Sequence, residues 1–269
     1  MFERFAGGAR PTLGARSPSD AGMSIFPLDA TLGLAGTPQS GTGQSALLTG
    51  LDAGAIFGGH FGPWVPVRLR PLVEEQSILR AVVDSGGKVA FANAYPRGWP
   101  GPGGSRRIAG PPLAARGAGV LDRHEDALAG GGAVASEIVN DGWRDHLGHR
   151  HIPRITPADA GRNLAAIAEE HDLTLYAHYT TDTVGHRRDL PGAVAALERV
   201  DAFLGGVLNR LSSDTLLLVA SDHGNIEDVT TGHTRNPALG LAAGPGAREA
   251  GGLRDLREVT PFVRRLLGA

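Results

Sequence analysis

The sequence contains no cysteine, and Lys88 is its only lysine. The absence of cysteine excludes disulfide bonds, thiolate metal sites and a cysteine nucleophile. Any metal ion bound by this chain must therefore be held by histidine and carboxylate side chains.

A strong charge of either sign is absent as well, because 26 basic and 28 acidic residues give a net charge of −2. Such a chain lacks the basic surface that binds nucleic acid or an anionic membrane. No apolar run approaches the roughly 20 residues of a membrane span, and the N-terminal segment MFERFAGGARPTLGAR lacks the apolar stretch of a secretory signal. We therefore expect a soluble, cytoplasmic protein whose partner is neither a nucleic acid nor a membrane.

Glycine and proline are abundant, with 40 and 18 residues among 269. The glycines follow no period, which excludes collagen, and 41% hydrophobic residues argue against wholesale disorder. The length suits one large domain, alone or with a smaller insertion.

Three short apolar runs predict buried strands: Val89–Ala92, Leu173–Ala177 and Thr215–Ala220. Their apolar character is continuous rather than alternating, which is typical of parallel strands covered on both faces. Helical patterns lie beside them, at 71–85, 157–171, 190–211 and 253–267. This alternation predicts an α/β fold with a doubly wound, mostly parallel sheet and helices on both faces.

Residues 96–133 interrupt the alternation, because they are rich in Gly, Pro and Arg and have little apolar periodicity. They predict a loop, or the start of an insertion that reaches about residue 156. The expected organisation is a metal-binding catalytic core formed by residues 1–93 and 157–269, with a small cap or insertion at 94–156.

The segment Ser221–Pro237, SDHGNIEDVTTGHTRNP, follows the predicted strand Thr215–Ala220 directly. Asp222 and His223 therefore lie at the carboxyl end of a strand, where open α/β sheets place their ligands. His233 adds a third possible metal ligand. The alternative interpretation is a polar surface loop with ordinary histidines.

A second segment, TTDTVGH at 180–186, also follows a predicted strand and places Asp182 and His186 four residues apart. On a helical turn or in a tight loop, this spacing lets both side chains reach one centre. The carboxyl ends of parallel strands share one edge of a sheet, so both segments should converge there. Carboxylate and imidazole ligands without thiolate favour zinc or manganese.

A third segment, GTPQSGTGQSALLTG at 36–50, combines glycines with an apolar stretch that suggests the first turns of a helix. Ser45 is then expected at a helix N-terminus, where the backbone amides and the helix dipole favour phosphate. An N-capping serine in a glycine-rich turn is the alternative. No Gly-Lys pair follows, so this is not the lysine-bearing phosphate loop.

Together GTGQS, TDTVGH, SDHGN and HTRNP, in this order along the chain, resemble the alkaline phosphatase superfamily. The likeness is greatest to its metalloenzyme branch, which holds cofactor-independent phosphoglycerate mutase and phosphopentomutase. The resemblance implies two divalent metal ions, Mn or Zn. It implies that one is held by Asp182, His186 and His233, and the other by Asp222 and His223.

The resemblance also implies a hydroxyl nucleophile at Ser45, with Thr42 and Ser40 as weaker candidates. Two divalent ions lower the pKa of such a hydroxyl and hold both oxygens of an in-line displacement at phosphorus. The implied function is phosphoryl transfer through a phosphoserine intermediate on a small phosphorylated metabolite.

One feature of the family is not found in this sequence. The family begins with a hydrophobic strand that ends in an Asp-Gly pair, whose Asp binds the same metal as Asp222. The first 24 residues contain neither an apolar run nor this pair, and Asp29, in FPLDATLG, is a poor substitute. We expect the first strand to be missing, either because the chain starts too late or because it is a degenerate member. The first interpretation is preferred, since the other ligands and the nucleophile are present.

Family mutases carry a sizeable insertion that excludes water from the phosphoenzyme. The candidate cap at 94–156 is small, which favours a phosphomonoester hydrolase over a phosphomutase. Candidate substrate-binding residues are His60, Arg106, Arg107 and Arg144, the arginines because they can grip phosphate or carboxylate. The competing interpretation is a non-catalytic metal- or phosphate-binding protein of the same fold.

Overall fold

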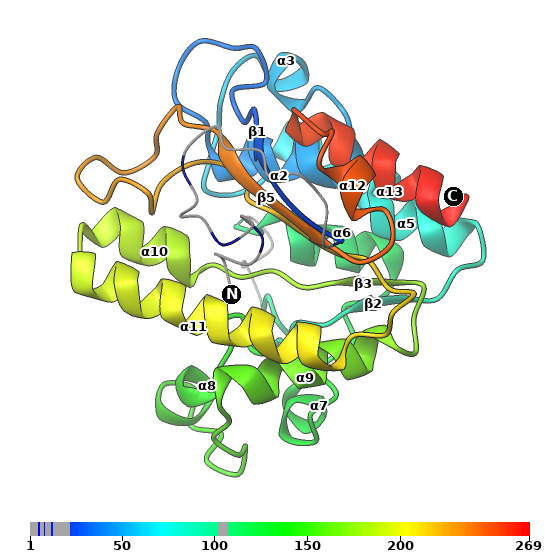
Figure 1. The fold of residues 1–269 in the computed structure, drawn as a ribbon, viewed down its shortest axis with the longest axis vertical. Helices are drawn as coiled ribbons and strands as arrows, with labels where there is room; N and C mark the ends of the chain where they lie inside the picture. The colour runs from blue at the N-terminus through cyan, green and yellow to red at the C-terminus, as the bar shows by residue number, and fades with distance from the viewer. Residues whose placement is uncertain (1–4, 6–7, 9–11, 13–21, 102–106) are drawn as a thin grey trace.

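The computed structural model describes Phe5, Gly8, Thr12 and residues 22–101 and 107–269 (Figure 1). The strands are β1 (Met23–Leu28), β2 (Val89–Phe91), β3 (Leu173–Leu175), β4 (Leu217–Ala220) and β5 (Ala238–Ala243). The helices are α2 (Ser40–Thr49), α3 (Ala53–Phe57), α4 (Arg70–Gln76), α5 (Ile78–Asp84), α6 (Gly110–Ala118), α7 (Glu125–Ala129), α8 (Asp141–Asp145), α9 (Pro157–Ala168), α10 (Thr180–Arg187), α11 (Leu190–Arg210), α12 (Ala247–Ala250) and α13 (Val259–Leu267). Two 3-10 turns, η1 (Val67–Leu69) and η3 (Leu256–Glu258), precede α4 and α13.

The α/β class and the three predicted strands are confirmed, because β2, β3 and β4 lie inside the three apolar runs. The predicted helices at 157–171 and 190–211 correspond to α9 and α11. The helix predicted at 71–85 is instead two helices, α4 and α5. The break is at Ser77, whose backbone is extended and whose hydroxyl accepts the amide of Arg80 as the N-cap of α5.

The strands form two small sheets rather than one doubly wound sheet, so that part of the prediction is not confirmed. One sheet has the order β1-β5-β4 and is antiparallel throughout, and the other pairs β2 with β3 in parallel. β5 runs antiparallel to β4 because the loop 221–237 contains no crossover helix and simply returns the chain beside the strand it left.

The prediction that no strand precedes Asp29 is wrong. β1, with the sequence MSIFPL, pairs along its whole length with β5 and buries Phe26 and Leu28. This strand is not evident from the sequence, because Ser24 and Pro27 interrupt its apolar run. Pro27 is tolerated because β1 is the outermost strand of its sheet, where a missing amide hydrogen costs no pairing.

Helices α9 and α11 pack closely against each other on one side of the molecule (Figure 1). The approach depends on Gly161 and Gly206, where a Cβ atom would overlap the backbone of the opposing helix. On the other side, α2, α5, α6 and α13 surround a second part of the core that includes Leu48, Leu79 and Leu113.

The loop predicted for residues 96–133 contains two helices, α6 and α7. α6 begins with Pro111 and Pro112, which suit the first turn of a helix, and it packs against α2, α4 and α5. A separate small hydrophobic cluster is formed by buried residues between Ala94 and Ile152, and Trp143 is its largest side chain. The cap at 94–156 therefore stays a prediction, and its segment 110–118 lies within the main core.

Within the described part of the chain, no helix combines the length and the apolar character needed to cross a bilayer.

Candidate metal centre

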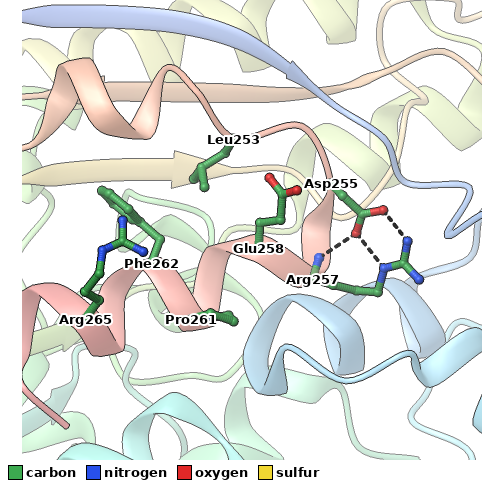
Figure 2. Close-up of a pocket in the computed structure, with 7 residues that line it drawn as sticks. All are labelled: Leu253, Asp255, Arg257, Glu258, Pro261, Phe262 and Arg265. Atoms are coloured by element: carbon green, nitrogen blue, oxygen red, sulfur yellow. Dashed lines mark hydrogen bonds and ion pairs between the residues drawn. The ribbon is translucent and has the colours of Figure 1, made fainter.

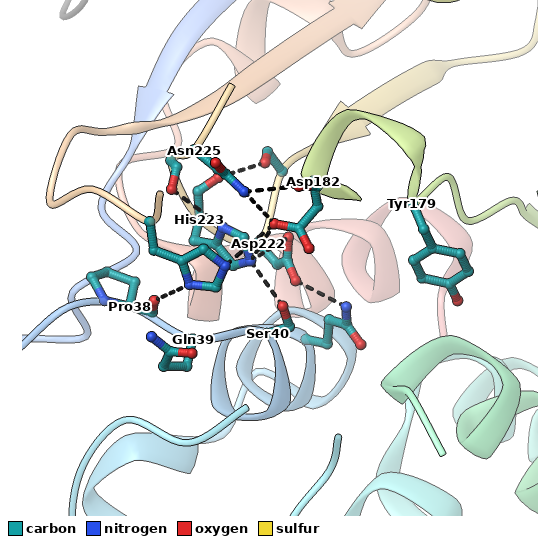
Figure 3. A network of polar contacts seen from close by, with 12 residues as sticks. Pro38, Gln39, Ser40, Tyr179, Asp182, Asp222, His223 and Asn225 are labelled. Atoms are coloured by element: carbon teal, nitrogen blue, oxygen red, sulfur yellow. Dashed lines mark hydrogen bonds and ion pairs between the residues drawn. The ribbon is translucent and has the colours of Figure 1, made fainter. Parts of the chain in front are cut away.

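The two segments that follow β3 and β4 converge as predicted (Figure 3). α10 begins at Thr180, five residues after β3, and carries Asp182 and His186 on one face. Asp222 and His223 come directly after β4. The Oδ1 atom of Asp182 lies 3.8 Å from Nε2 of His223, so the ends of the two strands meet at one point.

Asp182 is the centre of a group of imidazoles. Its Oδ1 atom lies 3.4 Å from Nε2 of His186 and 3.3 Å from Nε2 of His233. One ligand atom from each of these three residues lies within 4.8 Å of the others, which suits a single cation. The ring centroids of His223 and His233 are 3.8 Å apart, so His223 lies beside this group of three residues.

The loop between β4 and β5 is held in shape by Glu227. Its carboxylate accepts the backbone amide of Asn225 at 2.6 Å and the side-chain amide of Asn236 at 3.1 Å, and it also bonds the Thr234 hydroxyl. Asn225 in turn donates its side-chain amide to Oδ1 of Asp182 at 2.5 Å. The loop is thereby tied to α10, and Asp182 is held in position by a residue that the sequence analysis did not single out.

His233 is oriented by the backbone of the segment before α2. Its Nδ1 atom lies 2.9 Å from the carbonyl oxygen of Pro38 and donates to it, so Nε2 is the ring nitrogen that faces Asp182, 3.3 Å from Oδ1. This Nε2 atom is buried and has no hydrogen-bond partner among the described residues. A buried acceptor of this kind is the usual state of an imidazole that ligates a metal through Nε2.

Ser40 adds a hydroxyl to the centre. It is the first residue of α2 and is buried, and its Oγ atom lies 2.8 Å from Nε2 of His223. The same Nε2 atom is 3.7 Å from Oδ1 of Asp222. The second predicted metal pair thus lies beside Ser40, which the sequence analysis ranked among the weaker nucleophile candidates.

The expectation that Ser45 lies at a helix N-terminus is wrong, because α2 begins at Ser40. Ser45 is in the middle of the helix, and its hydroxyl donates to the carbonyl oxygen of Gly41 at 2.6 Å. The Thr42 hydroxyl is 3.2 Å from the carbonyl oxygen of Gln39 and accepts the Phe61 amide. Neither hydroxyl has a contact with the histidine group, whereas that of Ser40 does.

Gln44 connects Asp222 to helix α6. Its Nε2 atom donates to Oδ2 of Asp222 at 2.9 Å, and its Oε1 atom accepts the backbone amide of Gly110 at 2.8 Å. The close approach requires Gly43, where a Cβ atom would be 2.6 Å from the carbonyl oxygen of Asp222.

The electrostatics of the group favour ionised carboxylate. Burial alone would raise the pKa of Asp182, but contacts with His233 and Asn225 outweigh it and lower that pKa below its ordinary value. Burial would lower the pKa of His233, but Asp182 and the Pro38 carbonyl outweigh this and raise it. Asp182 and His233 therefore each favour the charged form of the other.

The residues fit divalent metal ions. Carboxylate oxygens and imidazole nitrogens converge without any thiolate, which is the ligand set expected for zinc or manganese. Asp182, His186 and His233 would hold one ion. Asp222 and His223, beside the Ser40 hydroxyl, would contribute to a second.

Asp29 does not join the group, although it follows a strand. Its side chain is exposed, and its Oδ1 atom accepts the amide of Thr31 at 2.8 Å. β1 is the outermost strand of its sheet, and β5 separates it from β4.

The assignment of the four candidate substrate-binding residues stays a prediction. Both ring nitrogens of His60 are buried without a partner among the described residues, and burial together with Arg235 lowers its pKa. Arg144 is used structurally, since its guanidinium donates to the carbonyl oxygens of Arg150 and Ile152. Arg107 is exposed, and Arg106 lies outside the described residues.

A separate pocket of about 420 Å³ lies between η3 and α13 (Figure 2). Arg257 at its rim is neutralised by Asp255 at 2.6 Å and by Asp52 at 2.7 Å. The pocket contains none of the histidines, and we assign it no chemistry.

Residues 157–261 match the family model described as Metalloenzyme superfamily. A phosphopentomutase from Methylobacterium sp. (strain 4-46) is 41% identical over 132 residues, which are 46% of this chain and 32% of that protein. A 2,3-bisphosphoglycerate-independent phosphoglycerate mutase from Cereibacter sphaeroides (strain ATCC 17025 / ATH 2.4.3) is 36% identical over 129 residues, or 43% of this chain and 25% of that protein. The chain thus spans about a third or less of the length of these curated relatives.

Among solved structures, alkaline phosphatase from the Antarctic bacterium TAB5 superposes with a TM-score of 0.53 at 13% identity. The superposition covers 91% of this chain and 88% of that structure, and it supports the fold alone. The matched segment 157–261 contains the ligands on α10 and on the loop after β4. The resemblance drawn from the motifs is therefore confirmed: the chain is similar to phosphopentomutase and cofactor-independent phosphoglycerate mutase over the part that also matches the Metalloenzyme superfamily.

Proposed function

We propose that this protein catalyses metal-dependent phosphoryl transfer on a small phosphorylated metabolite, with Ser40 as the nucleophile. The observation that carries the proposal is the position of the Ser40 hydroxyl, 2.8 Å from His223 in the group of converging carboxylates and imidazoles. The names of the relatives, phosphopentomutase and phosphoglycerate mutase, support a phosphorylated sugar or acid as substrate.

The protein's own residues would bind and orient the reactants. The Ser40 hydroxyl lies 2.8 Å from Nε2 of His223, which places Oγ beside the space that Asp182 and Asp222 border. Ser40 lies in the first turn of α2, the end of a helix that favours negative charge, which suits the oxygens of a phosphate group. A divalent ion, when bound, supplies Lewis acidity that lowers the pKa of the hydroxyl and offsets charge on the phosphoryl oxygens.

The reaction has two steps in this proposal. Oγ of Ser40 forms a bond to phosphorus while the bond from phosphorus to the alcohol oxygen of the substrate breaks, and the alcohol leaves with a proton. A second hydroxyl then attacks the phosphoserine, and the bond from phosphorus to Oγ breaks to restore Ser40. With water as the acceptor the protein is a phosphomonoester hydrolase, and with a hydroxyl of the substrate it is a phosphomutase.

The proposal is tested with purified protein loaded with Mn²⁺ or Zn²⁺, an aryl phosphate, and the Ser40→Ala variant as a matched control. We expect metal-dependent phosphate release that is lost in Ser40→Ala. Phosphate that moves within a pentose phosphate or a glycerate phosphate, without appearing free in solution, would identify a mutase.

A chain that binds both metals but neither releases nor moves phosphate would contradict catalysis. That result would favour the competing function, a non-catalytic metal- or phosphate-binding protein. The observation that favours this second function is the position of Asp29, which leaves the second metal pair without the additional carboxylate that the family resemblance implies.

A further inference from the structure

Gln39 directly precedes the proposed nucleophile and is the N-cap of α2, with an extended backbone at φ −138° and ψ 145°. N-capping side chains are usually short and accept an amide of the first helical turn. The longer Gln39 side chain makes no such bond. Figure 3 draws it next to Ser40 at the start of α2, and no dashed line leaves its carboxamide. The carboxamide is thus without a hydrogen-bond partner among the described residues.

Backbone amides of the first turn of α2 are also unused. The Thr42 amide donates to the Phe61 carbonyl oxygen at 3.0 Å, whereas the amides of Ser40 and Gly41 have no partner in the part of the chain that the structure describes. Free amides at this end of a helix favour an anion. α2 therefore combines two free amides and the free Gln39 carboxamide at one end.

The position of the Gln39 side chain depends on Gly62 in the neighbouring loop. A Cβ atom at Gly62 would lie 3.1 Å from Oε1 of Gln39, 3.2 Å from its Cβ atom and 3.2 Å from the Ser40 nitrogen. The loop passes this close because residue 62 has no side chain. The carboxamide packs against the loop with its Oε1 atom, so its Nε2 atom is the group left to donate.

The candidate metal centre itself offers a phosphoryl group few hydrogen-bond donors. Asp182 and Asp222 carry only acceptors when ionised. Neither forms an ion pair with an arginine or lysine of the described residues. A phosphoryl group has three non-bridging oxygens over which its charge is spread during transfer. The unused donor of Gln39, one position before the nucleophile, suits one of these oxygens.

We propose that the Gln39 carboxamide binds a non-bridging oxygen of the phosphoryl group that Ser40 receives, and that Gln39 is a substrate-binding residue of this site. The proposal rests on the proposed function, because it places the phosphoryl group at Ser40. Nε2 of Gln39 donates to this oxygen, beside the free amides of Ser40 and Gly41. The contact is to the group that all phosphate monoesters share, so it contributes equally to the binding of each of them.

The test uses the Gln39→Met variant, which keeps the length of the side chain and its packing against Gly62 but removes the donor. Isothermal titration calorimetry measures the affinity of the Mn²⁺-loaded protein for inorganic phosphate. We expect roughly tenfold weaker binding or more in Gln39→Met, because hydrogen bonds to charged groups are the stronger ones. Its affinity for Mn²⁺ and its free energy of unfolding should stay as in the wild type. Gln76→Met, at an exposed position on α4, is the matched control.

Turnover distinguishes this proposal from the proposed function. Gln39→Met should reduce kcat/KM by a similar factor for an aryl phosphate and a pentose phosphate. Phosphate binding that depends on Gln39, in a wild type without turnover, would contradict the proposed function and support the role of Gln39. A wild type that binds no phosphate, equal phosphate affinity in Gln39→Met, loss of Mn²⁺ binding in Gln39→Met, or an effect on only one of the two esters would each overturn the role of Gln39.

Discussion

Oγ of Ser40 and Nε2 of His223 lie 2.8 Å apart, although 183 positions separate the two residues along the chain. The contact joins the first turn of α2 to the end of β4 and brings a hydroxyl to the candidate metal centre. It distinguishes Ser40 from Thr42 and Ser45, the two other nucleophile candidates on α2, whose hydroxyls bond backbone groups.

Ser45→Ala should leave phosphoryl transfer intact. The Ser45 hydroxyl only donates to Gly41 within α2, so its loss should reduce the free energy of unfolding by about 1 kcal/mol. Activity assays and chemical denaturation of Ser45→Ala beside Ser40→Ala check this expectation. The assignment of Ser40 fails if Ser45→Ala is inactive while Ser40→Ala is active.

Gln44→Leu should weaken metal binding. Loss of its amide removes the hydrogen bond that orients Asp222, and residues that orient a ligand typically contribute 10- to 100-fold in affinity. Isothermal titration calorimetry with Mn²⁺ measures the affinity of each variant for the metal. Gln76→Leu, an exposed position on α4, is the control and should bind the metal as the wild type does. Identical affinities for both variants would contradict a role for Gln44.

Gly206→Ala should destabilise the fold, because the new Cβ atom would overlap the carbonyl oxygen of Ala158 on α9. Forced separation of closely packed elements typically costs about 1–3 kcal/mol. Gly130→Ala is the matched control, since its Cβ atom would meet only ordinary contacts at 3.5 Å and beyond and its φ is −87°. Denaturant unfolding measures the free energy of unfolding of both variants. Equal values for the two would contradict the close approach of α9 and α11.

His178 should make the free energy of unfolding depend on pH. Burial, opposed only in part by its hydrogen bond to the Ser136 carbonyl, lowers the pKa of His178 to about 4 from an ordinary value of 6.5. The unfolded chain therefore binds more protons between these values, so stability should be full above pH 6.5 and fall as the pH drops toward 4, by roughly 3 kcal/mol.

His178→Asn keeps a donor for the Ser136 carbonyl but cannot become charged. We expect its unfolding free energy to change less between pH 6.5 and 4 than that of the wild type, as urea unfolding at several pH values would measure. The other histidines contribute equally to both proteins. Parallel pH profiles would show that His178 is already charged in the folded protein.

The parts of the site that depend on buried parallel strands were predictable from the sequence. β3 and β4 are short continuous apolar runs, and the ligands follow them directly, so Asp182 and Asp222 could be located before the fold was known. The spacing of Asp182 and His186 suited a helical turn or a tight loop, and the structure has the helical turn.

The start of α2 could not be located in the same way. It depends on a close approach of distant backbone, because a Cβ atom at Gly41 would overlap the carbonyl oxygens of Phe61 and Trp64. Local composition contains no information about that contact, so Ser45 was ranked above Ser40 as the candidate nucleophile. β1 was missed for a related reason, since only its pairing with β5 makes a segment containing Pro27 a strand.

The central claim is that Ser40 receives the phosphoryl group. The most direct measurement is intact-protein and peptide mass spectrometry after rapid quenching of the metal-loaded protein with a phosphorylated substrate. The account predicts one added phosphoryl group, located on Ser40 and absent without metal or in Ser40→Ala. A phosphoryl group on Ser45 or Thr42, or turnover of substrate by Ser40→Ala, would contradict it.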